Sequence, residues 1–325
     1  MSAWSHILGG EWLNNGEETR ARFGEIARAR CAELETFPEG GRVLLVDADP
    51  VACAAGIAAV FASELPVLLF LGSPQWGRSE WEAVAQDVAP HAIWGGANLP
   101  QIAKRAGDGD EGNATEPQLF IPTGGTTGGV KFARHTCETL AAAADGLRSW
   151  LGGGVLHSVC FLPLFHVSGL MQLVRGWRTG GMVTLASWRE IEAGEVSAYP
   201  LPPDALTSIV PTQLARLLTV PGAAAWLRQF RGVFLGGATP WRELLDAARA
   251  ERLPLAPCYG MTETAAQIVA MRPEDFLETG TLAGEVLPHA CVELLADDAN
   301  STRSGEHTRL ACRLGRPARG MFGET

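Results

Sequence analysis

Short apolar runs alternate with helical segments along this chain, and this alternation constrains the fold more than any other feature. An apolar run at 42–47 is followed by an Ala-rich helical segment at 51–63 and a second apolar run at 65–71. A strand, a helix and a strand in this order form the unit of a parallel sheet. The alternation returns between residues 118 and 258. It predicts an α/β fold whose ligand-binding loops follow the carboxyl ends of the strands.

The later part of the chain supplies further elements. Strands are expected at 91–94, 118–122, 159–162, 182–185, 206–210, 232–235 and 255–258. Helices are expected at 81–88, 135–151, 169–177, 211–218 and 240–250. Residues 106–117 are rich in Gly, Asp and Asn and are expected to form a loop.

The composition is that of a globular protein, and it argues against several classes of partner. Apolar residues make up 46% of the 325 residues, whereas charged residues make up 19%. A net charge of −10 gives no support to a nucleic-acid binder. The longest apolar run, 51–62, is shorter than the ~20 residues that a membrane helix needs.

Seven scattered cysteines without a CxxC pair fit a reducing compartment better than a zinc site or a disulfide scaffold. The amino-terminal segment lacks the basic and apolar regions of a signal peptide. We therefore expect a cytoplasmic protein with small-molecule partners, without nucleic-acid or membrane partners, and with a homodimer as the default assembly.

A Gly/Thr-rich segment at 123–131 (TGGTTGGVK) carries the strongest local chemistry. Small residues allow several backbone N–H groups to face one point, two hydroxyls add donors, and Lys131 adds a positive charge. Such a loop suits a polyphosphate. It differs from a Walker A loop because Val130 stands where that motif requires Lys. The alternative is a flexible turn between a strand and a helix.

Three further motifs follow expected strands, where α/β proteins place their ligand loops. The segment 162–169 (LPLFHVSG) ends in a His/Ser pair, and 234–240 (FLGGATP) contains two glycines. The segment 257–264 (PCYGMTET) combines an aromatic ring, hydroxyls and a carboxylate.

The order and spacing of these motifs resemble the adenylate-forming superfamily, which contains acyl-CoA synthetases, luciferases and peptide-synthetase adenylation domains. Residues 123–131 are similar to its phosphate loop, S-G-T-T-G-x-P-K-G, and residues 259–263 are similar to its Y-G-x-T-E motif. The resemblance covers residues 40 to 295. Residues 132–136, 162–169 and 208–218 further resemble the o-succinylbenzoate–CoA ligase family of menaquinone and phylloquinone synthesis.

The resemblance implies a large amino-terminal domain, residues 1–295, of stacked α/β sheets with flanking helices. It also implies a two-step reaction. The o-succinylbenzoate carboxylate attacks the α-phosphate of ATP, which gives an acyl-adenylate and pyrophosphate, and the CoA thiol then displaces AMP. Mg²⁺ accompanies ATP. The protein contributes positioning and charge neutralisation rather than a nucleophile.

The same resemblance implies the nucleotide site. Its expected members are Thr123, Gly124, Gly125, Thr126, Thr127, Gly128, Lys131, Gly236, Gly237, Ala238, Cys258, Tyr259, Gly260, Met261 and Thr262. The loop would hold the β- and γ-phosphates, Thr262 would contact the α-phosphate, and Tyr259 would stack on adenine. Glu263 would bind Mg²⁺, which prefers oxygen ligands. The alternative for Glu263 is a surface acid at a helix amino terminus.

The implied acyl-substrate residues are His166, Ser168, Arg175, Gly236 and Thr264, and the implied catalytic residues are His166, Thr262, Glu263 and Lys131. Arg175 follows Ser168 by two helical turns, so both lie on one helix face. The guanidinium fork matches a carboxylate, and o-succinylbenzoate has a second carboxylate that does not react. The alternatives are a surface arginine and, for His166, a structural histidine.

The chain departs from the superfamily pattern at several points. Gly124 and Val130 stand where Ser and Pro are usual, which removes one hydroxyl and changes the stiffness of the loop. No lysine follows Lys131. We therefore expect the lysine-bearing C-terminal domain to be absent and residues 296–325 to form an atypical or disordered tail. Loss of that lysine is expected to slow adenylation by roughly 10²–10³.

Two other functions stay open on this sequence. One is an aryl- or acyl-CoA ligase for a different acid, although a fatty acid has no use for a cation at the end of its pocket. The other is a non-catalytic nucleotide- or acyl-binding relic. A purely structural α/β protein would leave Thr126, Thr127, Thr262 and Glu263 unexplained.

Overall fold

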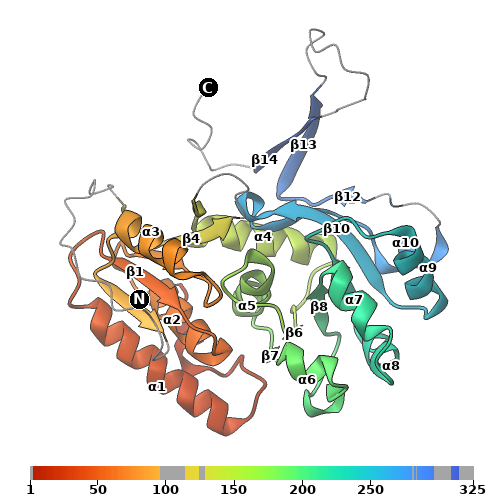
Figure 1. The fold of residues 1–325 in the computed structure, drawn as a ribbon, viewed down its shortest axis with the longest axis horizontal. Coiled ribbons are helices and arrows are strands. Elements are labelled where there is room, and N and C mark those ends of the chain that lie inside the picture. The colour runs from red at the N-terminus through yellow and green to blue at the C-terminus, as the bar shows by residue number, and fades with distance from the viewer. Residues whose placement is uncertain are drawn as a thin grey trace.

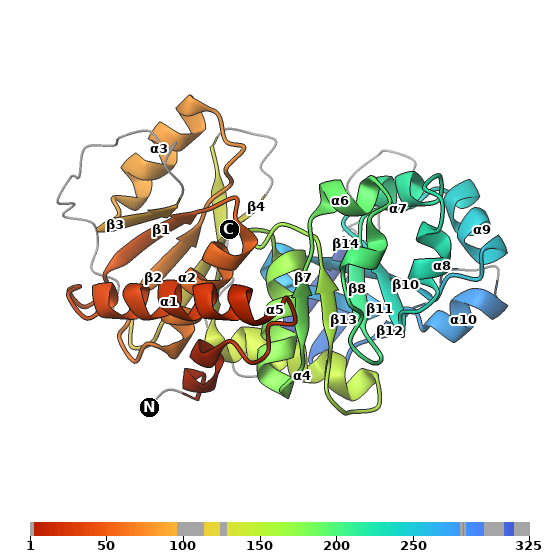
Figure 2. The same ribbon diagram turned by 90° about the horizontal axis from the view of Figure 1, so that it is seen from below.

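A computed structural model describes residues 3–95, 114–123, 129–279, 282, 284–295 and 309–314. Two sheets lie side by side with helices between them and on their outer faces (Figures 1 and 2). The predicted α/β architecture of stacked sheets with flanking helices is confirmed. The described residues contain no helix that is both long and apolar enough to cross a membrane.

The first sheet has five strands in the order β3-β1-β2-β4-β5. The strands are β1 (Arg42–Val46), β2 (Leu68–Leu71), β3 (Ala92–Gly95), β4 (Gln118–Thr123) and β5 (Lys131–Thr136). All pair in parallel except β5, which runs antiparallel to β4. The accompanying elements are η1 (Ser5–Gly9), α1 (Glu17–Leu34), α2 (Pro50–Ala62) and α3 (Arg78–Val88).

The helix α2 shows how the sequence selects this arrangement. Asp49 caps its first turn by accepting a hydrogen bond from the Val51 N–H, and Pro50 occupies the first helical position. Apolar residues surround the helix on nearly every face, and most of them are buried. A helix of this kind is stable only in an interior. It packs against α1 and the first sheet.

The second sheet has seven strands in the order β12-β11-β10-β9-β8-β6-β7. They are β6 (Ser158–Cys160), β7 (Val183–Leu185), β8 (Leu206–Ile209), β9 (Gly232–Leu235), β10 (Leu255–Met261), β11 (Ala266–Ala270) and β12 (Glu285–Val286). Strands β6 to β10 pair in parallel, whereas β11 and β12 pair antiparallel at one edge. A separate antiparallel pair, β13 (Ala290–Leu295) and β14 (Arg309–Leu314), projects from the body of the molecule (Figure 1).

The helices of the second half are α4 (Cys137–Trp150), α5 (Val167–Thr179), α6 (Trp188–Glu192), α7 (Pro211–Leu217), α8 (Ala223–Leu227), α9 (Arg242–Ala250) and α10 (Pro273–Glu278), with short 3₁₀ turns η2 (Val196–Ala198) and η3 (Thr262–Thr264). Helices α4 and α5 contact each other and lie between the two sheets (Figure 2). One hydrophobic cluster joins residues of β1 and β2 to residues of α5 and β7. The two sheets therefore share a core.

Three expectations need correction. The helix expected from residue 135 begins at Cys137, because residues 131–136 form β5 and complete a hairpin with β4. The strand expected to end at Cys258 continues to Met261, because β11 supplies it with a new partner. Residues 309–314, within the atypical or disordered tail expected at 296–325, form β14. The division at residue 295 stays a prediction.

Candidate functional site

The β4–β5 hairpin flanks the Gly/Thr-rich loop. Thr123 and Lys131 are the last paired residues on either side, and the Thr123 hydroxyl lies 3.5 Å from the Lys131 carbonyl oxygen. Lys131 is exposed. The predicted members of the phosphate site between these strands, Gly124, Gly125, Thr126, Thr127 and Gly128, lie outside the described residues. Both ends of the predicted loop are therefore fixed by the sheet.

A buried histidine connects this hairpin to the segment 259–263. His135 lies on β5 with 1% of its surface exposed, and its Nε2 donates a hydrogen bond of 2.8 Å to the Thr262 carbonyl oxygen. Burial lowers the pKa of His135, and the bond to Thr262 opposes this shift. The residue types around the two motifs did not reveal this link. The only signal for it was the polar residue His135 among inward-facing positions of β5, a strand that the sequence pattern did not predict.

The segment 259–263 begins on the extended strand β10. Tyr259 and Met261 point outward, with 45% and 40% of their surfaces exposed. Gly260 lies between them, where β11 approaches so closely that a Cβ atom would be 2.0 Å from the Ala266 carbonyl oxygen. Only glycine fits this position without moving the backbone of β11. An exposed aromatic ring is thus held on a tightly paired strand.

The turn η3 follows directly. Thr264 is buried, and its hydroxyl accepts a hydrogen bond from the Met261 N–H and donates one to the Ala266 carbonyl oxygen. Ala265 and Ala266 have φ values of 53° and 81°, which are costly for residues with a Cβ atom. Thr264 therefore holds a strained turn. Its predicted contact with substrate stays a prediction.

Two polar groups on this turn are available for a ligand. The Glu263 carboxylate is exposed, and neither it nor the Thr262 hydroxyl has a hydrogen-bond or ion-pair partner in the described part of the chain. No group of three or more His, Cys, Asp or Glu side chains in that part could hold a metal. Mg²⁺ commonly uses one or two carboxylates together with substrate phosphates. Glu263 fits that requirement as a single ligand.

The glycine turn after β9 lies beside β10. Gly237 has a φ of +81°, a backbone conformation that residues other than glycine rarely adopt. A Cβ atom on Gly236 would be 2.9 Å from the Cys258 sulfur. The Cys258 thiol donates to the Leu235 carbonyl oxygen, and burial raises its pKa to about 12. Gly236, Gly237 and the exposed Ala238 therefore present backbone next to the strand that carries Tyr259.

His166 and Ser168 lie at the start of α5. His166 precedes the helix, is exposed, and contacts the ring of Phe165 with a centroid separation of 4.5 Å. Its imidazole has no hydrogen-bond partner among the described residues, which does not favour the structural-histidine alternative. A Cβ atom on Gly169 would be 2.3 Å from the Pro163 carbonyl oxygen, so this turn requires glycine.

Arg175 lies two turns further along α5 and is buried, with 4% of its surface exposed. The surface-arginine alternative is therefore wrong. Its Nη2 donates a 2.5 Å hydrogen bond to Oε1 of Gln267 on β11, but no carboxylate in the described ranges pairs with it. Burial lowers its pKa to about 10, so the guanidinium stays charged at neutral pH. The thiols of Cys160 and Cys258 lie within its electrostatic reach.

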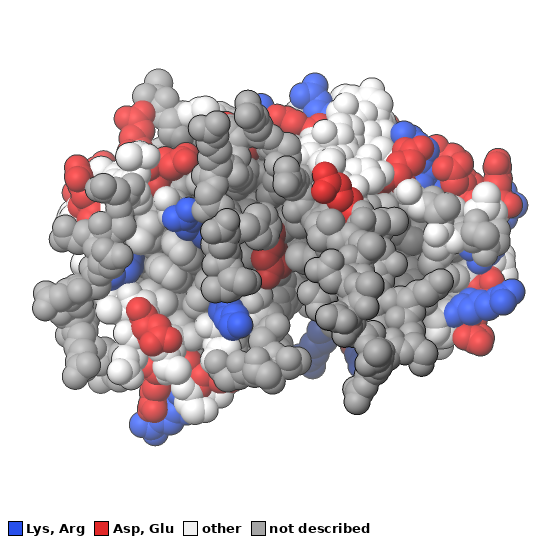
Figure 3. Space-filling model, turned by 90° about the horizontal axis from the view of Figure 1, so that it is seen from above, with Lys and Arg blue, Asp and Glu red and all other residues white. Residues whose placement is uncertain are grey.

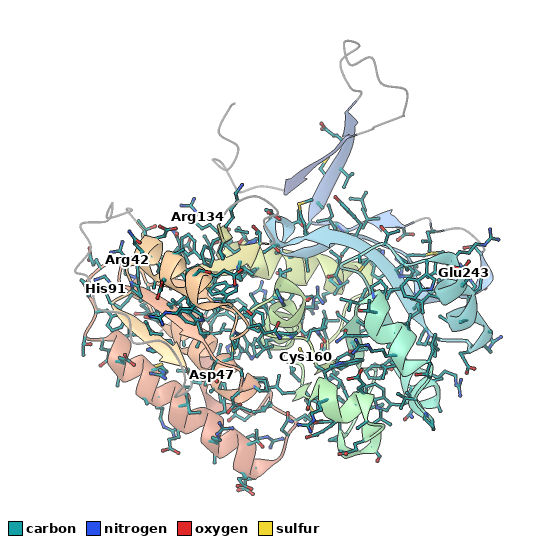
Figure 4. The ribbon with its side chains drawn as sticks, viewed as in Figure 1. Arg42, Asp47, His91, Arg134, Cys160 and Glu243 are labelled. Atoms are coloured by element: carbon teal, nitrogen blue, oxygen red, sulfur yellow. The ribbon has the colours of Figure 1, made fainter. Side chains whose placement is uncertain are left out.

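The side-chain view shows how these positions relate. Cys160, at the end of β6, lies near the middle of the molecule between the two halves, whereas Arg134 on β5 points outward (Figure 4). On the face seen from the side of the β13–β14 pair, acidic and basic side chains are interspersed, with no continuous basic area among the side chains that are coloured (Figure 3). The buried Arg175 is thus a separate, internal source of positive charge.

Comparison with known proteins identifies the family and related sequences. The AMP-binding enzyme family matches residues 40–315. The 2-succinylbenzoate–CoA ligase of Oceanobacillus iheyensis is 31% identical over 188 residues, which cover 57% of this chain and 38% of that protein. A probable 2-succinylbenzoate–CoA ligase of Mycobacterium tuberculosis is 35% identical over 153 residues, which cover 45% of this chain and 39% of that protein.

Solved structures show the same fold. The o-succinylbenzoate CoA synthetase (MenE) of Bacillus subtilis in complex with AMP superposes with a TM-score of 0.71 at 22% identity, over 91% of this chain and 66% of that chain. The N-terminal domain of FACL13 from Mycobacterium tuberculosis also has a TM-score of 0.71, at 17% identity, over 97% of this chain and 89% of that chain.

The fold and the site define an α/β domain with glycine-rich loops at the carboxyl ends of its strands. The match to residues 40–315 makes the assignment specific: the chain belongs to the AMP-binding enzyme family. The matched region spans about two fifths of the curated relatives' length.

Proposed function

We propose that this chain binds ATP and o-succinylbenzoate and activates the acid as an acyl-adenylate, from which CoA receives the acyl group. The observation that carries the proposal is Arg175, a charged and buried guanidinium without an acidic partner in the described chain. A buried cation of this kind calls for an anionic ligand. The curated relatives named 2-succinylbenzoate–CoA ligase support the choice of acid.

On the nucleotide side, the exposed ring of Tyr259 would stack on adenine, and the Thr262 hydroxyl would donate to the α-phosphate. Lys131 would add a positive charge beside the phosphate loop, and Glu263 would hold Mg²⁺. When bound, Mg²⁺ would neutralise charge on the phosphates. The contribution of this chain is to place the nucleotide so that its α-phosphate faces the acid.

On the acyl side, the aliphatic carboxylate of o-succinylbenzoate would attack the α-phosphorus. One oxygen of that carboxylate forms the new O–P bond. The bond between the α-phosphorus and the oxygen that bridges it to the β-phosphorus breaks, and pyrophosphate leaves with its electron pair. The CoA thiol then attacks the acyl carbon and forms the C–S bond of the thioester. The C–O bond to AMP breaks, AMP leaves with its electron pair, and the thiol proton is released. His166 and Ser168 would line the acyl site, and Arg175 would bind the ring carboxylate that does not react.

The test is a calorimetric titration of wild type and Arg175→Ala with o-succinylbenzoate, with benzoate as the control ligand. We expect micromolar binding to wild type, weakened in the variant by roughly 1.5–3 kcal/mol, or about 10- to 150-fold. AMP binding should persist in both proteins and shows that the variant is folded. If Arg175→Ala also fails to bind AMP, its weak binding of o-succinylbenzoate could result from misfolding. Arg175→Lys, which keeps the buried positive charge, therefore serves as the second variant.

Other outcomes change the proposal. If o-succinylbenzoate does not bind while AMP does, the choice of acid is wrong and an unspecified acyl-activating domain remains. If neither ligand binds, a non-catalytic relic becomes the better interpretation. Turnover is measured separately by o-succinylbenzoate-dependent exchange of labelled pyrophosphate into ATP, because ligand binding alone does not establish activity.

A further inference from the structure

Three polar side chains from distant parts of the chain have unpartnered polar atoms inside the molecule. Arg175 lies on α5, Gln267 lies on β11, and His289 lies in the turn between β12 and β13. Arg175 and Gln267 are 4% and 7% exposed. His289 packs against α4 so closely that a Cβ atom on Gly146 would be 2.1 Å from its Nδ1. We call these three side chains the Arg175 cluster.

Most hydrogen-bonding atoms of the Arg175 cluster have no protein partner. The cluster contains one bond, from Arg175 Nη2 to Gln267 Oε1 at 2.5 Å. Arg175 Nε, Gln267 Nε2 and both ring nitrogens of His289 are buried without a hydrogen-bond partner in the described residues. Unpaired buried donors are costly, and a buried unpaired charge is more so. The cluster therefore presents donors that require an acceptor.

His289 lies within the electrostatic reach of Arg175. Burial lowers the pKa of His289 to about 4, and the charge of Arg175 contributes to the shift. The neutral imidazole still carries one N–H. An anion bound beside the Arg175–Gln267 pair could accept hydrogen bonds from Arg175 Nε and the Gln267 amide, with the ring N–H of His289 as a further donor in the same region.

We propose that Gln267 determines the specificity of this site for an aromatic acid that carries a second carboxylate. The inference rests on the proposed function and adds to it a residue that no motif indicated. The Gln267 amide oxygen fixes the guanidinium without neutralising it, and its N–H group is left to donate to the ligand. A glutamate here would occupy the same volume but would pair with Arg175 and repel the ligand carboxylate.

The isosteric variant Gln267→Glu provides the test. The probes are o-succinylbenzoate and 4-oxo-4-phenylbutanoate, which has the same acyl chain but lacks the ring carboxylate. We expect o-succinylbenzoate to bind the variant at least tenfold more weakly, whereas the affinities for 4-oxo-4-phenylbutanoate and AMP stay within twofold. The variant should unfold at a temperature equal to or above that of wild type, because it gains an ion pair with Arg175.

Gln229→Glu is the matched control, since Gln229 is exposed and its amide donates to the Ala225 carbonyl oxygen of its own helical segment rather than to a charged group. It should change neither affinity. If Gln267→Glu fails to fold, Gln267→Met removes the amide without adding a charge, and it should also weaken o-succinylbenzoate selectively. Equal binding of o-succinylbenzoate to wild type and the folded variant would overturn the inference.

The proposed function can fail independently of this inference. If o-succinylbenzoate does not bind wild type, phthalate serves as the simplest aromatic dicarboxylate. Phthalate binding that Gln267→Glu weakens, with benzoate binding unchanged, supports the specificity role and rejects only the named acid. Absence of any difference between dicarboxylate and monocarboxylate probes rejects the role of Gln267.

Discussion

At the scale of single residues, the site depends on close backbone contacts that leave no room for a side chain. Gly260 is the clearest case, because its neighbour across the sheet is a carbonyl oxygen rather than a movable side chain. Glycine motifs in a sequence show where such contacts are needed, but not which strand makes them. The partner here, Ala266, lies on a strand that the sequence pattern did not predict.

Gly260→Ala should lower the free energy of unfolding by about 2–3 kcal/mol, because a Cβ atom would overlap the Ala266 carbonyl oxygen. AMP affinity should fall with it, since Tyr259 and Thr262 flank this position. Urea unfolding and AMP titration measure both effects. Gly77→Ala is the control: its Cβ would meet only the Glu80 side chain at 3.6 Å, and the change should stay within about 0.5 kcal/mol. Equal effects at the two positions would contradict the steric argument.

His289 should make stability depend on pH. Its folded pKa of about 4 lies below the ordinary value of 6.5, so between these values the unfolded chain binds a proton that the folded chain does not. The free energy of unfolding should therefore fall as pH decreases from 6.5 to 4. Urea unfolding at several pH values should give a shallower slope for His289→Gln than for wild type. Identical slopes would show that His289 does not contribute.

At the scale of elements, the β4–β5 hairpin and the η3 turn act as one unit. The hydrogen bond from His135 to the Thr262 carbonyl oxygen joins them inside the protein. It couples the end of the predicted phosphate loop to the residues expected to contact the α-phosphate and Mg²⁺. Each motif was visible in the sequence, but the connection between them was not.

His135→Leu should destabilise the protein by about 1–3 kcal/mol, because it leaves the Thr262 carbonyl without its buried donor. AMP binding should weaken more than thermal stability alone accounts for, as the η3 turn loses its orientation. The neighbouring variant Arg134→Leu is the control, since Arg134 is exposed on the same strand. Calorimetry at a temperature where both variants are folded makes the comparison. Unchanged AMP affinity in folded His135→Leu would separate the hairpin from the nucleotide site.

The sequence predicted most elements well where a strand or helix is bounded by its own local signals. α2 is an example, because Asp49 and Pro50 mark its start. Elements whose partners supply the stability were missed: β5 depends on β4, and β11 depends on β10. The same difference between local signals and partner contacts explains which residues of the candidate site could be predicted. Motif residues could be named, whereas Gln267 and His289 gain meaning only from the contacts that folding creates.

At the scale of the whole molecule, the two sheets are joined through α4 and α5 rather than forming independent halves. Trp177 on α5 is a central contact, and it makes edge-to-face contacts with Trp12 and Phe61 at centroid distances of 5.3 and 5.6 Å. Phe61 lies on α2, which packs on the first sheet, whereas Trp12 lies between η1 and α1 in a segment that is hydrogen-bonded to Val183 of β7. Arg175 lies on the same helix, so the proposed acyl site is built on the joint between the sheets.

Trp177→Ala should lower the free energy of unfolding by about 3–5 kcal/mol, because it removes a large side chain that is 2% exposed. Unfolding should stay a single transition, with far-ultraviolet circular dichroism and tryptophan fluorescence coincident in urea. Trp241→Ala, at a position that is 45% exposed, should change stability by less than about 0.5 kcal/mol. Two separate transitions in wild type would show that the sheets unfold independently.

The thiols beside Arg175 offer a natural reporter of this region. Burial raises the pKa values of Cys160 and Cys258 to about 12, so almost no reactive thiolate exists at neutral pH while the protein is closed. The thiol of Cys291, by contrast, is exposed. An alkylating reagent would therefore modify Cys291 at once, whereas modification of the buried Cys160 would wait for transient openings of the interior. The rate of Cys160 labelling, read by mass spectrometry, would measure how often those openings occur, and a ligand bound at Arg175 would lower that rate.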